Sequence, residues 1–213
     1  MILSNRIVPL AITVGTAYAL AAAFALQLLH PEIDPVRLTV SQYATGPHGF
    51  LLTIAFLVSG INLFALLIGI WAAPWRRSRL EPALLAVAAI CACLVSIFPA
   101  DIYRPGAHLS AAGLLHRALA GLAFACLTLV ALRTSRQIWV TEKRRTLKRL
   151  IRASAVGLAL AIAIDIAVLA LGLPIGGLGE RIVILFAALW LLLMAFYLSG
   201  DLPLRSENPQ RTD

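Results

Sequence analysis

The side chains best suited to chemistry are concentrated in one polar stretch, residues 98–117, of an otherwise apolar chain. This stretch carries Asp101, Arg104, His108, His116 and Arg117. An acid, histidines and arginines can together supply a general base, an orienting carboxylate and a binding group for phosphate or carboxylate. Because His116 and Arg117 follow the apolar run 111–115, we expect them on a helix that has already entered the apolar region.

The composition indicates what surrounds this stretch. The chain has 213 residues, of which 61% are hydrophobic and 13% are charged. Soluble domains are nearer to about half apolar and about a quarter charged. We therefore predict an integral membrane protein whose chain crosses the bilayer several times and forms one domain.

Six apolar runs predict an all-α fold of three transmembrane hairpins, because a spanning helix needs about 20 apolar residues. The expected helices cover about 7–29, 50–73, 82–99, 111–132, 153–172 and 182–198. They form one domain over residues 1–200, and the polar tail 201–213 is predicted to be disordered. The proline-containing segment 30–47 should be a loop or a partly helical cap. The basic, moderately amphipathic segment 133–152 favours an extension along the membrane surface.

The basic residues predict the orientation of the chain in the membrane. With the N-terminus in the cytoplasm, 14 of the 18 lysines and arginines lie on the inner side. The positive-inside rule thus favours a cell-membrane protein with both termini, and the tail, in the cytoplasm. Attraction of these residues to anionic lipid headgroups explains the net charge of +8 without a nucleic-acid partner.

This orientation places further candidates on the outer side. Ser41 and Tyr43 lie in the first outer loop, and Glu180 and Arg181 precede the sixth apolar run. Asp165 lies inside the fifth run, about 10 Å below the outer end of its helix. A membrane-embedded acid is costly unless it is paired or faces water. Asp165 is therefore either part of a buried ion pair with Arg117 or Arg181, or a functional group, and the two interpretations are compatible.

These residues suit an enzyme, a hydrolase or a transferase, that acts on a lipid or lipid-linked group at the outer leaflet. In this hypothesis His116 is the base, Asp101 orients it and Ser41 is a candidate nucleophile. Further catalytic candidates are Glu180 and Asp165, and the substrate-binding candidates are Tyr43, Arg104, Arg117 and Arg181.

Other functions stay open at the level of sequence, including whether the chain is an enzyme at all. Zinc or another divalent metal could bind His48, His108 and His116. On one helix, however, His108 and His116 would be about 12 Å apart, so the chain would have to fold back between them. The alternatives are a transporter or channel whose outer vestibule leads to Asp165, and a regulatory or structural subunit with a membrane partner or a second copy.

An offset of 68 residues lays 30–56 onto 98–124 with six identical positions. His48 then corresponds to His116. Such a repeat would make the first two hairpins related units, each with a histidine at the start of its returning helix. Chance identity in a chain so rich in alanine and leucine is the other explanation.

Four short motifs, in order, resemble a prokaryotic membrane family. They are Ser41-Gln42-Tyr43 with Gly46-Pro47, Phe98-Pro99-Ala100-Asp101, Gly113-Leu114-Leu115-His116, and Glu180-Arg181. The family is the domain of unknown function number 998, and the resemblance covers about residues 7–198. It implies six helices and a membrane location but no reaction. That family is distantly similar to the FRAG/DRAM/Sfk group, some members of which are linked to lipid-anchor remodelling.

Overall fold

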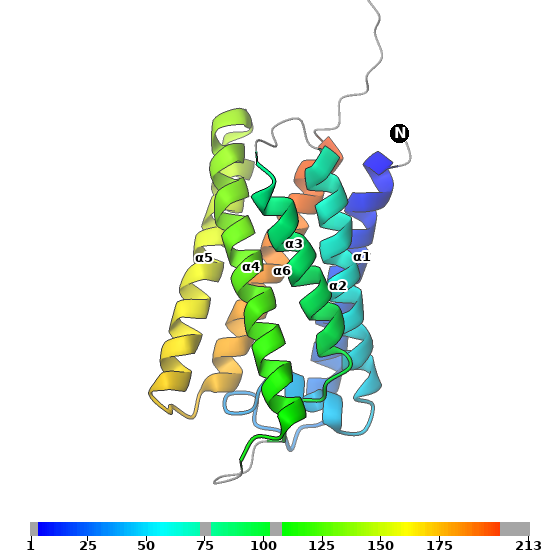
Figure 1. The fold of residues 1–213 in the computed structure, drawn as a ribbon, viewed down its shortest axis with the longest axis vertical. Helices are drawn as coiled ribbons and strands as arrows, with labels where there is room; N and C mark the ends of the chain where they lie inside the picture. Colours follow the sequence, from blue (N-terminus) through cyan, green and yellow to red (C-terminus); the bar gives the residue numbers. More distant parts are fainter. Residues whose placement is uncertain (1–3, 73–77, 103–107, 201–213) are drawn as a thin grey trace, which may run out of the picture.

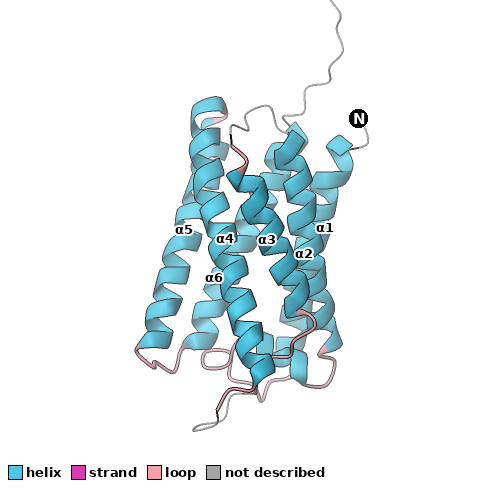
Figure 2. Cartoon of the chain, viewed as in Figure 1, coloured by secondary structure: helices cyan, strands magenta, loops and turns pink. Residues whose placement is uncertain are grey.

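The computed structural model describes residues 4–72, 78–102 and 108–200, and this part of the chain contains helices but no strand (Figures 1 and 2). The elements are α1 (Ser4–Leu29), the 3₁₀ helix η1 (Val40–Thr45), α2 (Phe50–Ala72), α3 (Leu80–Val95), α4 (Ala111–Thr141), α5 (Arg145–Ala170) and α6 (Gly176–Gly200). The prediction of a partly helical cap in segment 30–47 is confirmed by η1.

Five of the helices, all except α3, are long and apolar enough to cross a membrane. The chain is therefore a polytopic, all-helical membrane protein. Helix α3 is apolar but has only 16 residues, which is about 24 Å at 1.5 Å per residue and less than the hydrocarbon core of a bilayer. It ends at Val95, before Pro99, instead of running to residue 99 as predicted. Six complete crossings stay a prediction.

The basic segment between the fourth and fifth helices differs from the prediction. Instead of lying along the membrane surface, it continues α4 to Thr141 and starts α5 at Arg145. The basic side chains are accommodated by contacts within this hairpin. Lys148 and Arg152 pack over the ring of Trp139, 5.1 and 4.8 Å from its centroid. Cation–π contacts of this kind join the end of α4 to the start of α5 and let the cationic heads stay near solvent.

The helices form a closed ring in chain order. Each helix packs against its neighbours in sequence, and α6 packs against α1 (Figure 1). Successive helices run in opposite directions, so the ends of α1, α3 and α5 meet the starts of α2, α4 and α6 at one end of the bundle. We call this end, which also carries η1, the site end. All described residues that the sequence placed on the outer side lie here.

The two halves of the bundle differ in packing. The half away from the site end is filled by side chains that are completely buried, among them Ile12, Ile70, Leu85 and Trp190. Helices α2 and α3 approach each other at Gly60, where a Cβ atom would lie 2.9 Å from the Ala89 carbonyl oxygen. Small residues at such crossings allow close backbone contact, which is the main source of helix association in a membrane.

Two glycines offer a matched test of this packing. We expect Gly60→Ala to lower the stability of the folded protein by about 1–3 kcal/mol, because α2 and α3 must move apart. A Cβ atom added at the α4 residue Gly121 would have no neighbour within 4 Å, so Gly121→Ala should be neutral or gain up to about 1 kcal/mol of helix propensity. Denaturant unfolding of the purified protein in detergent measures both changes. Equal effects would contradict the close α2–α3 contact.

Candidate functional site

Arg181, near the start of α6, holds the loop 30–47 in place. Its Nη1 donates to the carbonyl oxygens of Leu38 (2.9 Å) and Gly177 (3.0 Å). Its Nη2 donates to Gln27 Oε1 (2.8 Å) and to the Tyr43 hydroxyl (3.3 Å), and the Tyr43 hydroxyl donates to Gln27 Oε1 (2.6 Å). Tyr43 is only 1% exposed. The structure therefore uses Arg181 and Tyr43, both predicted to bind substrate, as internal supports of the site.

The first turn of α6 completes this docking. The Leu178 amide donates to the Val36 carbonyl oxygen at 3.0 Å, and the Gly177 amide donates to the Arg37 carbonyl oxygen at 3.3 Å. A side chain at Gly177 would collide with the carbonyl oxygen of Leu38. Glycine is needed here because the two backbones touch, and this contact carries η1 over the start of α6.

His116 is the residue best placed to act as a base. It is 3% exposed, lies on the second turn of α4, and packs edge-on against Phe56 with ring centroids 5.7 Å apart. Its Nδ1 lies 2.7 Å from the Phe98 carbonyl oxygen. A carbonyl can only accept, so Nδ1 carries the proton and the neutral ring keeps its lone pair on Nε2. No described residue hydrogen-bonds to Nε2, which leaves it free for a substrate.

Asp101 has a different role from the predicted one. Its carboxylate accepts from the Ser110 hydroxyl (2.6 Å) and from the Ser110 amide (2.8 Å). Ser110 is the N-cap of α4 and accepts from the Gly113 amide at 3.0 Å. The hydrogen bonds from Ser110 lower the pKa of Asp101. Asp101 thus fixes the start of α4, while the Phe98 carbonyl, not Asp101, orients His116.

Glu180 and Ser41 meet where η1 passes over α6. The carboxylate of Glu180 accepts a hydrogen bond from the Val40 amide. The Ser41 hydroxyl lies 3.0 Å from the hydroxyl oxygen of Thr39. The docked loop therefore brings a hydroxyl and a carboxylate from residues about 140 positions apart to the same place.

Asp165 lies on α5 against the backbone of Gly179, where a Cβ atom would collide with its carboxylate. The predicted ion pair with Arg117 or Arg181 is not formed, since no described cation lies within salt-bridge distance of Asp165. Its half-buried carboxylate instead faces a cavity that it shares with Glu180. Among the described residues the ion-pair interpretation of Asp165 is therefore wrong, and its role as a functional group stays a prediction.

One cavity of about 300 Å³, the polar cavity, collects most of the predicted site residues between α4, α5 and α6. The residues predicted as functional that line it are Ser41, Asp101, His116, Arg117, Asp165 and Glu180. They come from all three hairpins, as the sequence suggested.

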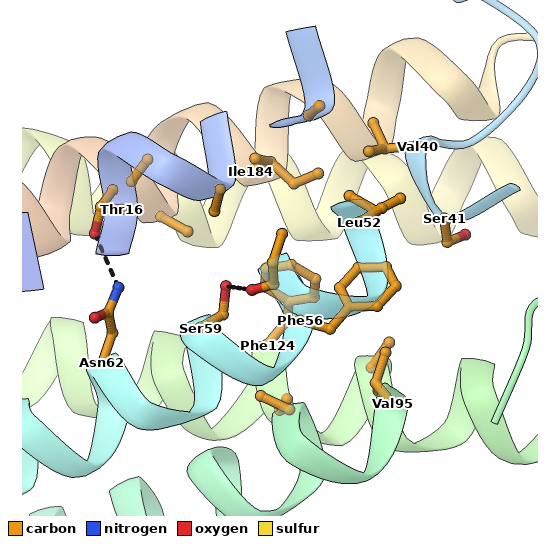
Figure 3. A pocket seen from close by; sticks show the side chains of 18 of the residues that line it. Thr16, Val40, Ser41, Leu52, Phe56, Ser59, Asn62, Val95, Phe124 and Ile184 are labelled. Atoms are coloured by element: carbon orange, nitrogen blue, oxygen red, sulfur yellow. Dashed lines mark hydrogen bonds between the residues drawn. The ribbon is translucent and has the colours of Figure 1, made fainter. Parts of the chain in front are cut away.

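A second cavity of about 170 Å³, the apolar cavity, lies deeper in the bundle (Figure 3). Its walls are mainly alanine, leucine and phenylalanine side chains from α1, α2, α3, α4 and α6. Five residues line both cavities, so the two spaces border each other there: Ser41, His116, Ala120, Phe124 and Glu180. Polar side chains therefore lie at the border between the polar cavity and the apolar cavity.

The remaining predicted residues do not join this site. His48 and His108 are exposed, and the described residues contain no group of three or more His, Cys, Asp or Glu side chains that could hold a metal ion. The proposed zinc ligands His48, His108 and His116 are thus not brought together. Arg104 lies outside the described residues.

The 68-residue offset pairs two histidines that occupy unlike positions. His48 precedes α2 with φ of 59°, whereas His116 lies inside α4.

Three groups that shape the site were not predicted from the sequence. Ser110 could have been found, since a serine directly before an apolar run is an N-cap signal. Gln27 and the Phe98 carbonyl had no such signal. Gln27 contacts Tyr43 and Arg181, which lie 16 and 154 positions further along the chain. A backbone carbonyl has no sequence signature.

The fold and the two cavities define a class: a polytopic helical membrane protein with a polar site at one end of the bundle. The chain belongs to the family described as "Protein of unknown function (DUF998)", which it matches over residues 13–197. This confirms the family resemblance of the four motifs. Searches of curated proteins and of solved structures gave no match. Similarity to the FRAG/DRAM/Sfk group stays a prediction.

His30 forms a pH-sensitive link within the loop beside the site. Its Nδ1 lies 2.8 Å from Glu32 Oε1, and its Nε2 lies 2.9 Å from the Pro47 carbonyl oxygen. Both partners are acceptors, so both ring nitrogens donate and the ring is protonated in this arrangement. The hydrogen bonds to Glu32 and to Pro47 raise the pKa of His30 above 6.5.

This link predicts how loop stability changes with pH. A raised pKa in the folded state gives stability that is complete below the unfolded pKa and is lost as pH rises through the folded one. We expect Glu32→Gln to lower the melting temperature at about pH 6 and to have little effect at about pH 9, where His30 is neutral. The control is Asp34→Asn, since Asp34 faces Arg37 and not a histidine. A pH-independent effect of Glu32→Gln would contradict a protonated His30.

Proposed function

We propose that this chain is a membrane enzyme, a hydrolase or transferase, that acts on a lipid or lipid-linked group. The observation that carries the proposal is the shared border of the polar and apolar cavities, the junction, whose polar residues are Ser41, His116 and Glu180 and whose apolar residues are Ala120 and Phe124. An amphiphile has a polar headgroup and an apolar tail, and the bond between a headgroup and its tail would lie at this junction. The site end faces the extracytoplasmic side and both termini are cytoplasmic.

The distribution of basic residues supports this orientation. The described cationic residues of the α4–α5 hairpin, such as Arg136, Arg145 and Arg149, lie at the end opposite the site. By the positive-inside rule, that end is cytoplasmic. The cell membrane is the location that this topology implies, and its lipids are the first partners to test. A second copy of the chain and a different membrane protein are the further partners to test.

The chemistry assigned to the site is a proton transfer followed by attack on an ester. His116 Nε2 takes the proton from the hydroxyl of water, of an acceptor or of Ser41, and that oxygen attacks the carbonyl carbon or the phosphorus. The leaving alcohol then receives the proton from His116. With water the net reaction is hydrolysis, and with an acceptor hydroxyl it is transfer. When Ser41 attacks, it holds the acyl or phosphoryl group as an ester; water or an acceptor hydroxyl, deprotonated by His116, then attacks this ester, and the Ser41 oxygen leaves and takes the proton back from His116. Arg117, exposed at the rim of the polar cavity, would bind a phosphate or carboxylate of the substrate.

The two carboxylates supply the remaining roles. Glu180, held by the Val40 amide, lies at the junction and can share the proton relayed by His116. Asp165 lines the polar cavity without a described hydrogen-bond partner, so it is suited to bind a hydroxyl or amine of the headgroup. Ser41 would act as nucleophile after its hydroxyl turns from Thr39.

A transporter or channel is the second candidate, and Asp165 in an open cavity is the observation that favours it. A route across the membrane would have to pass the packed half of the bundle, where Ile70, Leu85 and Trp190 are completely buried.

A regulatory or structural subunit is the third alternative. It predicts that a partner protein co-purifies in a fixed ratio after mild solubilisation.

The enzyme proposal predicts a large effect of one histidine and none of another. His116→Gln should lower turnover by about 10²–10⁴-fold, the usual contribution of a general base. The exposed His48, which lines neither cavity, is the matched control, and His48→Gln should keep full activity. The measurement compares the lipids of cells that lack the protein with cells that express wild type or either variant.

Two outcomes would count against an enzyme. Lipid profiles that do not change when the protein is absent would remove the basis for the proposal. Full activity of a stably folded His116→Gln protein would exclude His116 as the base.

A further inference from the structure

We propose that the apolar cavity binds one hydrocarbon chain of the lipid and that its closed inner end sets the chain length that the protein accepts. The inference rests on the proposed function in placing the headgroup in the polar cavity. It goes beyond that function by naming a binding site, its ligand and the residues that determine specificity.

The walls of the cavity match a single unbranched chain. Small side chains line it on several helices, including Ala19, Ala92, Ala123 and Ala188. Along α6 the lining runs from Glu180 to Leu191, which is about 16 Å at 1.5 Å per residue. A dry cavity of about 150 Å³ in a protein core accommodates a benzene molecule. A space of about 170 Å³ that is this long is therefore narrow, and it suits one chain better than two chains or a ring system.

At the inner end lie polar side chains that are already satisfied, among them Thr16, Ser59 and Asn62 (Figure 3). The Ser59 hydroxyl donates to the Ala55 carbonyl oxygen at 2.8 Å. The buried Asn62 amide faces Thr16, and its polar atoms can be satisfied by the α1 backbone within 3.0 Å. These groups need no polar ligand. Beyond them on α2, Leu66 is completely buried and does not line the cavity, so we place the inner end of the cavity before the packed half of the bundle.

The open end lies where chemistry is proposed. Because Ser41, His116 and Glu180 line both cavities, a chain in the apolar cavity has its polar end at His116. The α5 wall of the polar cavity includes Ile166 and Leu169, whose side chains are also 61% and 60% exposed on the outer surface of the bundle. A lipid can therefore enter sideways from the bilayer between α4 and α5, where Gly121 leaves open space.

The test is a chain-length series measured as binding, without turnover. The full-length protein in detergent is titrated with lysophosphatidylglycerols of increasing acyl length. Each methylene buried in the cavity should raise the affinity about fourfold until the chain reaches the inner end, after which the affinity stays constant. The control is Ala163→Leu, which alters an exposed α5 residue that lines neither cavity. Each affinity is divided by the affinity of this control for the same lipid, which removes the contribution of lipid partition into detergent.

Two variants move the inner end in opposite directions. Ala188→Leu fills part of the cavity from α6, so the affinity should stop rising at a shorter acyl chain than in the wild type. Leu191→Ala removes side chain from the deep wall, so the affinity should stop rising at a longer acyl chain. If Ala188→Leu does not fold, Leu191→Ala still decides. An affinity that stops rising at the wild-type acyl length in a folded variant, or no dependence on acyl length, would overturn the inference.

Failure of this inference is distinguishable from failure of the proposed enzyme. Suppose that the acyl length at which the affinity stops rising shifts in the two variants, but cells lacking the protein have unchanged lipids. The chain-binding cavity is then supported and the enzyme proposal is not. Suppose instead that turnover depends on His116, but the acyl length at which the affinity stops rising is the same in both variants. The enzyme proposal is then supported, and the cavity is not the chain-binding site. Tight binding of a sterol or of a two-chain lipid alone would also overturn the single-chain assignment.

Discussion

The docking of loop 30–47 by Arg181 is the interaction on which the site end depends. One guanidinium joins α1 through Gln27, the loop through Leu38, η1 through Tyr43 and its own helix through Gly177. Arginine suits this role because its planar fork of donors stays charged and can satisfy several oxygens at once. The backbone contacts of the α6 first turn then place η1 over Glu180, so Ser41 and His116 border one space.

A second constraint comes from the use of small residues in the ring of helices. At Gly60 the absence of a side chain lets α2 and α3 touch, whereas at Gly121 the same absence leaves space unfilled. Close backbone contacts of this kind provide dispersion energy that holds the helices together in lipid. The half of the bundle away from the site end is filled by buried side chains, and the half at the site end can then be hollow. An apolar cavity of about 170 Å³ is compatible with a stable fold because the opposite half is tightly packed.

Among the described residues, the acids Asp101 and Glu180 of the site end are held by hydrogen bonds to neutral groups and form no ion pair. Asp101 is bound by Ser110, and Glu180 by the Val40 amide. Backbone and hydroxyl donors fix these side chains without a cation, which leaves Arg117 at the cavity rim for an anionic group. The Phe98 carbonyl similarly sets the tautomer of His116. The site is thus preorganised by backbone groups of two loops, the one before α2 and the one before α4.

Sequence alone was enough to establish the membrane class, the approximate extent of most helices and the set of residues that share one end of the bundle. Hydrophobic run length and charge placement are local properties, and they decide which segments enter a bilayer and where polar residues collect. Hence Ser41, Asp101, His116, Arg117, Asp165 and Glu180 could be named in advance, and all six line the polar cavity.

The roles of these residues, in contrast, followed from the packing of the helices and loops. Arg181 and Tyr43 look like ligand-binding groups in sequence but are satisfied internally, and Asp101 holds the N-cap of a helix. The α4–α5 hairpin continues through its basic residues because Trp139 packs against Lys148 and Arg152. The partner of each polar group and the space left between helices depend on contacts across many residues and on backbone atoms, which no local pattern of side chains encodes.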